Sequence, residues 1–478
     1  MVFGCDMILL LILSLLFRII KIDFPLSSGF VWGDGTRDFL VANHILKYGE
    51  RPIFGPFNLL FDSGIFNSPL YFYILSLMLA PFNHILTLSM VNIFLQLACI
   101  VLIYLIAKKL FDAKTAFIAV ALFSFNPAVL QQSDFIWQPF LMQTVVLLAL
   151  YFFIQKRLIS FFLLSFAASI HNSAFPWIVV FFLYLPKKKI IWGLLILFLS
   201  LALFYSPIFL SAQFKGIDFS KETMIATSLN GYLNNFIANF REFFNIFHPY
   251  QNLMMVLLLS LAFVKRQRNL FLTIMLILAP FVFAAFFNKI RLHYLTLSLS
   301  AFSILAAEVF TSLTKKTHLF SRSILFILLL IIFTADFAFI KEIKSPLSNQ
   351  TKINQLVFII TKELHQIQKQ EGFKDINFFQ VYSIALIKGP AFYYPLLDTI
   401  LLVPLEDRLK QPLTKISDNA FNHVQTGGKK YLFVACHKFS DIDVNTCLTE
   451  FNKTNPGYQI VKAVYESNSI YVYLAKKS

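Results

Sequence analysis

Residues 86–107 read LTLSMVNIFLQLACIVLIYLIA, and Lys108 and Lys109 follow at once. A helix needs about 20 apolar residues to cross the hydrocarbon core of a bilayer, so this stretch predicts a spanning helix with a basic end. Of the 478 residues in the chain, 58% are hydrophobic and 14% are charged, whereas soluble domains carry about 25% charged residues. The composition excludes a soluble enzyme, a disordered chain and a disulfide-dense secreted domain, and it indicates a polytopic membrane protein.

The same criterion predicts eleven α-helical spans. They are 3–20, 86–107, 115–131, 137–154, 158–170, 174–186, 190–210, 251–264, 270–287, 292–312 and 323–340. The apolar segment 68–82 is too short to span, because 15 helical residues extend about 22 Å, and we expect a juxtamembrane or re-entrant helix there. Residues 158–186 are interpreted as a helical hairpin with its tip at 171–173.

Five basic clusters separate these spans and predict the topology. They hold fourteen Lys and Arg residues within 108–114, 156–157, 187–189, 265–268 and 315–322, and Asp112 is their one acidic neighbour. Cytoplasmic loops carry an excess of Lys and Arg, so the pattern predicts that all five clusters and the N-terminus lie inside. The location expected is a plasma (inner) membrane, with the C-terminal domain extracytoplasmic.

Charge density predicts two domains. In residues 1–340, 37 positions are charged, and in residues 341–478, 29 of 138 are. The first region is expected to be the membrane domain, with 21–85 as its first outer loop, and the second a small α/β domain. That domain is predicted to contain a helix over 350–370, ending at Gly372, and strands over 376–382, 430–436 and 468–475.

The other partner signals are weak. The net charge of +16 comes from the short clusters, without a basic stripe or nucleic-acid motif, so no nucleic-acid partner is expected. The four cysteines lack metal-binding spacing; Cys436 and Cys447 can pair if their domain faces an oxidising compartment, and two free thiols are the alternative. Asp441 and Asp443 form a DxD pattern without a nucleotide-binding fold around it.

The first outer loop carries the best candidate chemistry. Asp34, Arg37 and Asp38 can share one helical face, where a carboxylate can accept a proton and a guanidinium can hold an anionic leaving group. The structural alternative is the start of a surface helix, with Asp34 as N-cap and the other two side chains solvated.

This loop resembles the GT-C membrane glycosyltransferases, in particular the protein O-mannosyltransferase-like family 39 and the aminoarabinose transferases. The resemblance rests on the order of short motifs rather than on any one of them. They are 33–42 (GDGTRDFLVA), Gly55-Pro56, 68–73 (SPLYFY), 133–139 (SDFIWQP), His171-Asn172 and 291–294 (RLHY).

The resemblance implies transfer of a sugar from a polyprenyl-phosphate carrier to a lipid, glycan or protein acceptor at the outer face of the membrane. Asp34 matches the family's general base, and Arg37 matches the arginine that contacts the lipid phosphate. Gly35 replaces the second acidic residue of the family motif, and Asp38 can take over its role one turn later. A divalent metal is conceivable for this chemistry, but the sequence shows no ligand cluster.

Further binding residues are expected on the outer loops, each with a structural alternative. Arg291 and its neighbours can hold phosphate or contact lipid headgroups, and His171 can orient substrate or hydrogen-bond within its turn. Trp137 can stack on a sugar or anchor the helix at the interface. The candidate substrate-binding residues are Arg37, Asp38, Asp134, Trp137, Gln138, His171, Arg291, His293 and Tyr294.

Three other functions fit the same outer cavity. A lipid or glycan transporter or flippase would favour an inverted repeat, which is not evident. A polysaccharide polymerase or ligase would favour a long, Arg-rich late loop, but 211–250 holds only Arg241. A nonenzymatic scaffold would follow if Gly35 marks a dead site.

Overall fold

The structure is a computed structural model of the chain. It describes residues 5–19, 34–56, 67–83, 85–126, 129–130, 138–211, 228–245, 268–284, 296–315, 347–373, 379–386, 392–393, 405, 408–409, 429–438, 444–466 and 470–478. The described chain divides into two compact units. One holds α1 and the helices from Leu88 to the end of α15; the other holds α3 and the elements from α17 onward, and α4 is divided between them.

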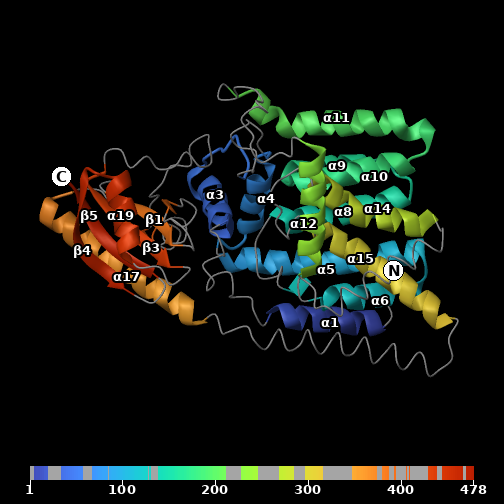
Figure 1. Cartoon of the computed structure of the whole chain (residues 1–478), viewed down its shortest axis with the longest axis horizontal. Coiled ribbons are helices and arrows are strands. Elements are labelled where there is room, and N and C mark those ends of the chain that lie inside the picture. The colour runs from blue at the N-terminus through green and yellow to red at the C-terminus, as the bar shows by residue number, and fades with distance from the viewer. Residues whose placement is uncertain are drawn as a thin grey trace. The chain divides into compact units, whose positions relative to one another are not determined.

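The first unit is helical (Figure 1). Its described helices are α1 (Cys5–Ile19), α5 (Ile85–Leu110), α6 (Ala113–Ser124), α8 (Gln138–Ile154), α9 (Ile159–Ile170), the short 3-10 helix η2 (Asn172–Ala174), α10 (Phe175–Tyr184), α11 (Lys187–Phe209), α12 (Leu229–Asn245), α14 (Arg268–Ala284) and α15 (Thr296–Lys315). Helix α4 (Leu70–Leu79) has ten residues and occupies the segment predicted to be too short to span.

Most predicted spans coincide with one of these helices. The expected spans 251–264 and 323–340 lie outside the described residues. Helix α12 lies in the segment 211–250, which the sequence predicts to be a loop. Among the described helices, two are long and apolar enough to cross a membrane by length and composition alone, Leu86–Leu110 and Lys187–Phe209. The number of spans and their orientation stay predictions.

Helix α11 presents an apolar outer surface. Ile191 is 76% exposed, Phe198 and Leu203 are each 64% exposed, and the first turn of the helix carries the three lysines 187–189. A large apolar face is unfavourable in water and suits hydrocarbon, and lysines at the end of such a helix suit the lipid headgroups. The residue pattern of α11 is therefore that of a lipid-facing helix.

Many buried polar groups of the helical unit are paired within their own helix or with a neighbouring helix. Several buried hydroxyls donate to the carbonyl four residues earlier on their own helix, as Thr311 does to Ala307 at 2.7 Å. Other bonds join helices, and two of them reach α15: Gln143 Nε2 of α8 donates to Ser300 Oγ at 2.8 Å, and Thr115 Oγ1 of α6 donates to Glu308 at 3.4 Å. Buried polar groups are costly unless paired, so these bonds help fix the packing of α15.

The predicted hairpin over 158–186 is present. Helix α9 ends at Ile170, His171 caps it, and η2 leads directly into α10. Pro176 lies in the first turn of α10, where its missing N–H has no helical partner to lose. The tip therefore falls at 171–173, as the sequence pattern predicts.

The second unit contains α3 (Asp34–Tyr48) and an α/β domain. Helix α3 ends at Gly49, whose φ of 67° is a conformation that glycine adopts without a steric penalty. In the α/β domain, α17 (Leu347–Glu371) ends at Gly372 with φ 71°, as predicted from its sequence. The remaining elements are β1 (Phe379–Leu386), β2 (Phe392–Tyr393), β3 (Tyr431–Lys438), α19 (Val444–Thr454), β4 (Tyr458–Glu466) and β5 (Ile470–Lys477).

The five strands form one sheet in the order β2-β1-β3-β5-β4. Strand β1 runs parallel to β3, and the other pairs are antiparallel. The central strand β3 is buried on both faces: Phe433 packs with α17 residues such as Ile360, whereas Val434 packs with Phe451 of α19. The three predicted strands coincide with β1, β3 and β5, and β2, β4 and α19 were not predicted.

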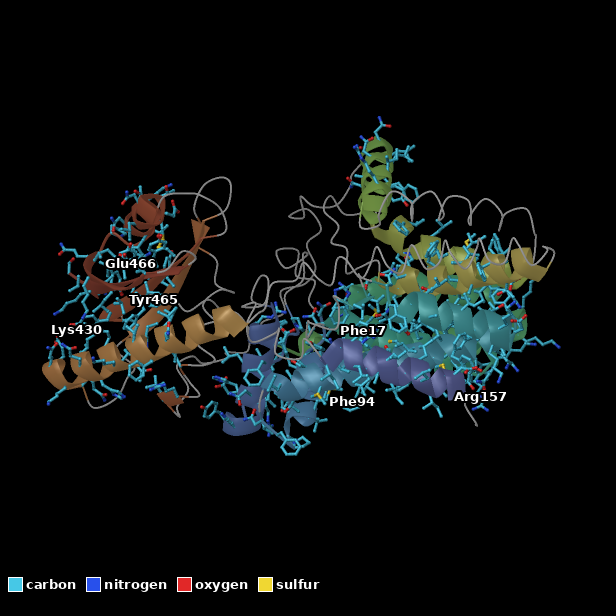
Figure 2. All side chains as sticks on the ribbon, turned by 90° about the horizontal axis from the view of Figure 1, so that it is seen from below. Phe17, Phe94, Arg157, Lys430, Tyr465 and Glu466 are labelled. Atoms are coloured by element: carbon cyan, nitrogen blue, oxygen red, sulfur yellow. A yellow bond between two sulfur atoms is a disulfide. The ribbon has the colours of Figure 1, made fainter. Side chains whose placement is uncertain are left out.

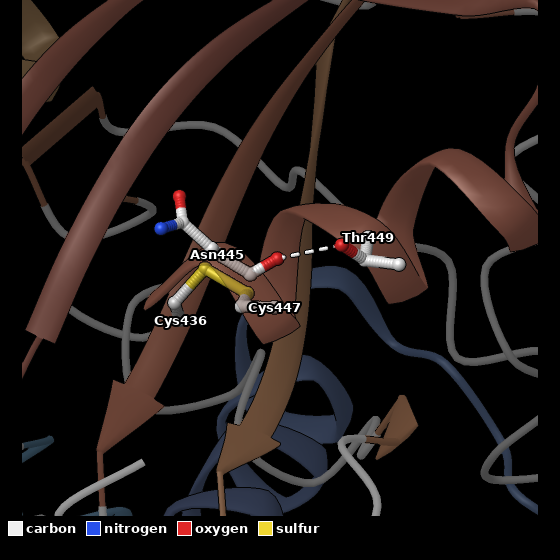
Figure 3. Close-up of a disulfide and its surroundings, with 4 residues drawn as sticks. All are labelled: Cys436, Asn445, Cys447 and Thr449. Atoms are coloured by element: carbon white, nitrogen blue, oxygen red, sulfur yellow. Dashed lines mark hydrogen bonds between the residues drawn. A yellow bond between two sulfur atoms is a disulfide. The ribbon is translucent and has the colours of Figure 1, made fainter. Parts of the chain in front are cut away.

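A disulfide joins Cys436 of β3 to Cys447 of α19 (Figure 3). The Cα atoms lie 6.1 Å apart, and both cysteines are fully buried. Of the two states that the sequence allows, a disulfide and two free thiols, the structure has the disulfide. The bond fixes the first turn of α19 on the sheet, where Thr449 Oγ1 also donates to the Asn445 carbonyl at 2.8 Å.

The edge strand β4 is irregular. Its pairing with β5 shifts register between Ile460 and Lys462 and again between Ala463 and Tyr465. Lys462 projects from this strand to Glu363 of α17, with the ammonium 2.5 Å from a carboxylate oxygen. The opposite edge, β2, is two residues long.

Candidate functional site

Residues 67–70 are held by a tight backbone clasp with Gly55 and Pro56. Gly55 N–H donates to the Asn67 carbonyl at 2.8 Å, and Asn67 Nδ2 donates to the Pro56 carbonyl at 3.1 Å. A methyl group at Gly55 would lie 2.1 Å from the Ser68 carbonyl oxygen. Only glycine allows residues 55–56 and 67–68 to approach this closely, because any side chain at position 55 would collide with the Ser68 backbone. This explains why a glycine precedes Pro56 in the motif.

Ser68 attaches this segment to two helices. Its N–H donates to the Ser169 carbonyl of α9 at 3.3 Å, and its Oγ donates to the Phe204 carbonyl of α11 at 2.7 Å. The Oγ also accepts the Leu70 N–H at 3.3 Å in the first turn of α4. Ser68 therefore fixes where α4 begins, at the C-terminal end of α9 beside His171.

His171 lies at the hairpin tip and is 8% exposed. Its Nδ1 accepts the Ser173 N–H at 3.2 Å and lies 2.8 Å from Ser173 Oγ. Because Nδ1 accepts a backbone proton, the ring is neutral and carries its own proton on Nε2. The imidazole is thus oriented by the turn, in accord with the structural alternative.

Gln138 lies at the same end of the helical unit as His171. Helices α8 and α9 pack against each other and are joined by a short turn at 155–158, so the start of α8 lies beside the end of α9. Helix α8 also contacts η2. Gln138 is buried, and the structure therefore brings together two of the predicted binding residues.

Two further residues of this end were not predicted. Ser173 orients His171, and Trp177, in the first turns of α10, is fully buried with an indole N–H that has no hydrogen-bond partner in the described part of the chain. A buried donor without a partner is unusual and often marks a ligand or water position. The sequence signal that could have identified these two residues is the stretch 171–177. There, polar residues and a tryptophan interrupt the apolar hairpin.

Arg37 and Asp38 form a buried ion pair in the second unit. Arg37 Nε and Nη2 each lie 2.7 Å from Asp38 Oδ1, and the side chains are 2% and 0% exposed. The alternative of two solvated side chains is therefore wrong. Arg37 engages Asp38 Oδ1 twice, so this carboxylate has less capacity to accept a substrate proton and is well placed to orient the guanidinium.

The remaining predicted site residues lie outside the described part of the chain. The backbone of Asp34 begins α3, but its side chain is not described. The other such residues are Asp134, Trp137, Arg291, His293 and Tyr294, and the DxD residues Asp441 and Asp443. Among the described residues, no group of three His, Cys, Asp or Glu side chains could hold a metal ion.

Comparison of the sequence with known proteins finds no match, whereas comparison of the structure finds similar solved structures. The sequence matches no family model and no curated protein. The structure is similar to ArnT from Cupriavidus metallidurans in the apo state, with a TM-score of 0.59 and 12% identity, over 98% of this chain and 97% of that one. The same enzyme bound to undecaprenyl phosphate gives a TM-score of 0.55 over the same shares.

A second similar structure is an oligosaccharyltransferase from Archaeoglobus fulgidus tethered to an acceptor peptide. Its TM-score is 0.53 at 13% identity, and the match covers 98% of this chain and 73% of that one. At 12–13% identity these matches establish the architecture. The chain thus has the fold of the GT-C membrane glycosyltransferases, the fold that its loop motifs predict.

Proposed function

We propose that the protein is a membrane glycosyltransferase that moves a sugar from a polyprenyl-phosphate carrier to a lipid, glycan or protein acceptor. The observation that carries this proposal is the fold, which matches over nearly the whole of both chains a transferase structure that holds undecaprenyl phosphate. The loop motifs that resemble this family occur in the same order along the sequence.

The proposed chemistry is a displacement at the anomeric carbon of the sugar. The acceptor oxygen forms a bond to this carbon, the bond between the carbon and the phosphate oxygen breaks, and Asp34 takes the acceptor proton. Polyprenyl phosphate leaves with the bonding electrons. Phosphate is already a good leaving group, so positioning and charge neutralisation are the main tasks of the protein.

Arg37 is proposed to hold the departing phosphate, and Asp38 to position Arg37. The paired geometry supports this division, because a guanidinium fixed on one side by a carboxylate presents its planar donors in a defined direction. Gly35 then leaves Asp34 as the base, and Asp38 supplies the charge of the missing acidic residue without acting as a base.

The other candidate residues are proposed to contact donor or acceptor. His171 and Gln138 lie together and would supply neutral hydrogen-bond donors to sugar hydroxyls. Asp134, Trp137, Arg291, His293 and Tyr294 are proposed to contact donor or acceptor as well. No metal is assigned a role.

The reaction is proposed to occur at the outer face of the plasma (inner) membrane. Two features support this side: the basic clusters favour an inside location for the opposite loops, and disulfides such as Cys436–Cys447 form mainly in oxidising compartments. The transferase domain would span 1–340, and 341–478 would be extracytoplasmic.

The test is release of sugar from a radiolabelled polyprenyl-phosphate-sugar by purified protein. Asp34→Asn should lower turnover by about 10²–10⁴-fold with donor affinity largely kept, because it removes a proton acceptor and keeps the shape. Asp6→Asn, an identical change at an exposed position on α1, is the matched control and should be silent.

Three outcomes would contradict parts of the proposal. Transfer directly from a nucleotide sugar would exclude the lipid-phosphate donor. If Asp38→Asn loses turnover while Asp34→Asn lowers turnover only slightly, Asp38 and not Asp34 is the general base. Near-native turnover in both variants would remove this loop from the reaction.

A further inference from the structure

The helical unit contains a cavity of about 520 Å³ at the end opposite His171. The cavity lies where α5 and α10 end, where α8 turns into α9, and where α14 begins. Small-molecule sites have volumes of about 300–1,000 Å³, so the space is large enough for part of a ligand. Nothing in the proposed transfer reaction uses this end of the unit.

Two side-chain bonds hold the cavity rim together. Asn269 Nδ2, in the first turn of α14, donates to the Leu110 carbonyl at the end of α5 at 2.6 Å. Lys189 Nζ, in the first turn of α11, donates to the Lys156 carbonyl at 2.8 Å. These contacts cap helix ends that would otherwise leave carbonyls without donors, so the rim is a built part of the fold.

The cavity lining combines apolar side chains with polar groups, and the cavity is partly open to the surface of the helical unit. Phe153 and Ile154 of α8 and Leu272 of α14 line its depth, and Leu183 of α10 lines it while being 68% exposed. An exposed leucine at the mouth places an apolar path between the cavity and the surface of the helices. The apolar part of the lining suits an alkyl chain, and the polar part suits a headgroup.

The rim, by contrast, is strongly basic. Lys156 lines the cavity, and six further cations lie near the ends of α5 and α8 and at the start of α11. Five of them are exposed, namely Lys108, Lys109, Arg157, Lys187 and Lys188, whereas Lys189 is half-buried. Figure 2 shows Arg157 at this end of the helical unit. The lining residues include no carboxylate, and nearby Asp112 is engaged as the N-cap of α6. The charge at this rim therefore calls for an anionic group.

Lys156 has an unusual backbone for a lysine. Its φ is 59°, and the N–H groups of Lys156 and Arg157 donate to the carbonyls of Phe153 and Phe152, which is the Schellman ending of a helix. Glycine is the usual residue at this left-handed position, because other residues pay a steric penalty there. Lys156 thus occupies a backbone conformation that disfavours lysine. It does so beside a cavity whose lining residues include no carboxylate.

We propose that this cavity is a binding site for an anionic phospholipid, with an acyl chain between α8, α10 and α14 and the phosphate at Lys156 and the basic rim. The site is separate from the proposed transfer reaction and does not depend on it. Basic pockets between membrane helices are suited to such headgroups, since each lysine near the surface adds favourable energy with an anionic lipid.

The test is lipid retention by the purified full-length protein, measured by native mass spectrometry after exchange into phosphatidylglycerol or phosphatidylcholine. Phosphatidylglycerol should be retained selectively. Lys156→Gln should weaken its retention about fivefold, whereas the matched control Lys114→Gln, an exposed lysine of the same end outside the cavity lining, should have little effect.

Lys156→Gly separates binding from folding. It removes the same charge but relieves the left-handed backbone, so it should weaken lipid retention about fivefold while the melting temperature stays equal or rises. Leu183→Trp narrows the exposed mouth without changing charge and should also lower retention.

The proposal is overturned if phosphatidylcholine is retained as well as phosphatidylglycerol, or if Lys156→Gln and Lys114→Gln behave alike. A further arm adds inorganic phosphate at constant ionic strength. Failure of phosphate to displace the lipid supports recognition of headgroup and chain together; full displacement shows a simple anion site and overturns the lipid assignment.

Discussion

The two units satisfy their polar groups in different ways. In the helical unit, hydroxyls donate to nearby carbonyls and neutral amides bridge helices, as Gln143 does to Ser300. In the α/β domain, Glu371 accepts hydrogen bonds from three side chains at the surface of the domain, and a disulfide joins β3 to α19. The first pattern suits surroundings without water, where local bonds are the available partners. The second suits a solvated, oxidising side, where charges are inexpensive and disulfides persist.

The largest expected effect is a difference in thiol labelling between the two units. It tests whether α17 and the first turn of α11 lie on opposite sides of the membrane. Cysteines introduced at Lys188 and Gln350, in a Cys5→Ser background, should differ completely in labelling by an impermeant thiol reagent applied from outside. Gln350→Cys should label and Lys188→Cys should not, because basic loops are retained inside. Reversed labelling would overturn the whole predicted topology, and lysed cells, in which both positions label, are the control for reactivity.

Gly55→Ala should cause the largest loss of stability in the helical unit. The added methyl group would lie 2.1 Å from the Ser68 carbonyl oxygen, and a backbone atom cannot move away as a flexible side chain can. We expect a loss of at least about 4 kcal/mol, seen as lower yield and melting temperature of the purified protein. Gly457→Ala, where no atom lies within 4 Å, is the matched control, and equal stability of both variants would contradict the clasp.

Removal of the disulfide should be the corresponding effect in the α/β domain. The double variant Cys436→Ser, Cys447→Ser releases a closed loop of 11 residues and should cost about 3 kcal/mol. Hydrogen exchange of β3 and α19 in the full chain measures the loss locally. Hydrogen exchange in the helical unit is the internal control and should stay the same. Faster exchange in the helical unit with unchanged exchange in β3 would contradict a local stabilising role of the disulfide.

Ser68→Ala should have a moderate effect. It leaves the Phe204 carbonyl without the 2.7 Å donor and the start of α4 without its acceptor, which should cost about 1 kcal/mol. Ser206→Ala, an exposed serine that bonds within its own helix, should cost almost nothing. Equal melting temperatures for the two variants would show that Ser68 does not anchor the segment.

The smallest effect is expected at Glu371 and depends on pH. Hydrogen bonds from Lys430, Tyr431 and Lys476 lower the pKa of the Glu371 carboxyl from 4.5 to about 2. The folded state therefore binds its proton less readily than the unfolded state, so this contribution is present above about pH 4.5 and is lost as the pH falls toward 2. Glu371→Gln should flatten the acid loss of α/β-domain stability in this window, and an unchanged acid profile would contradict the role of the pair network.

Much of the fold was predictable because its signals are local. The apolar length of 86–107, the shortness of 68–82 and the turn at 171–173 each follow from a few neighbouring residues. Strand β4 was missed because its two register shifts break the alternation of apolar and polar residues that identifies a strand. Helix α12 was missed because the segment between spans was interpreted as a loop, although its sequence is amphipathic.

The site was less predictable because its contacts are long-range. No local pattern indicates that Ser68 meets both Ser169 and Phe204, which are 101 and 136 residues away. The burial of Arg37 and Asp38 was also hidden, since adjacent charges on a helix suggest an exposed surface. The sequence shows which residue types are present and in which order. Which of these residues contact one another depends on the fold.

The irregular edge strand β4 has a consequence for how the protein behaves when crowded. A long, flat strand with free backbone groups is a template on which another chain can add a strand, and repetition of that step leads to aggregates. The two bulges of β4 interrupt such a template, Lys462 adds a charge to it, and β2 at the other edge is too short to serve. Many copies held close together on one membrane can therefore keep their sheets separate.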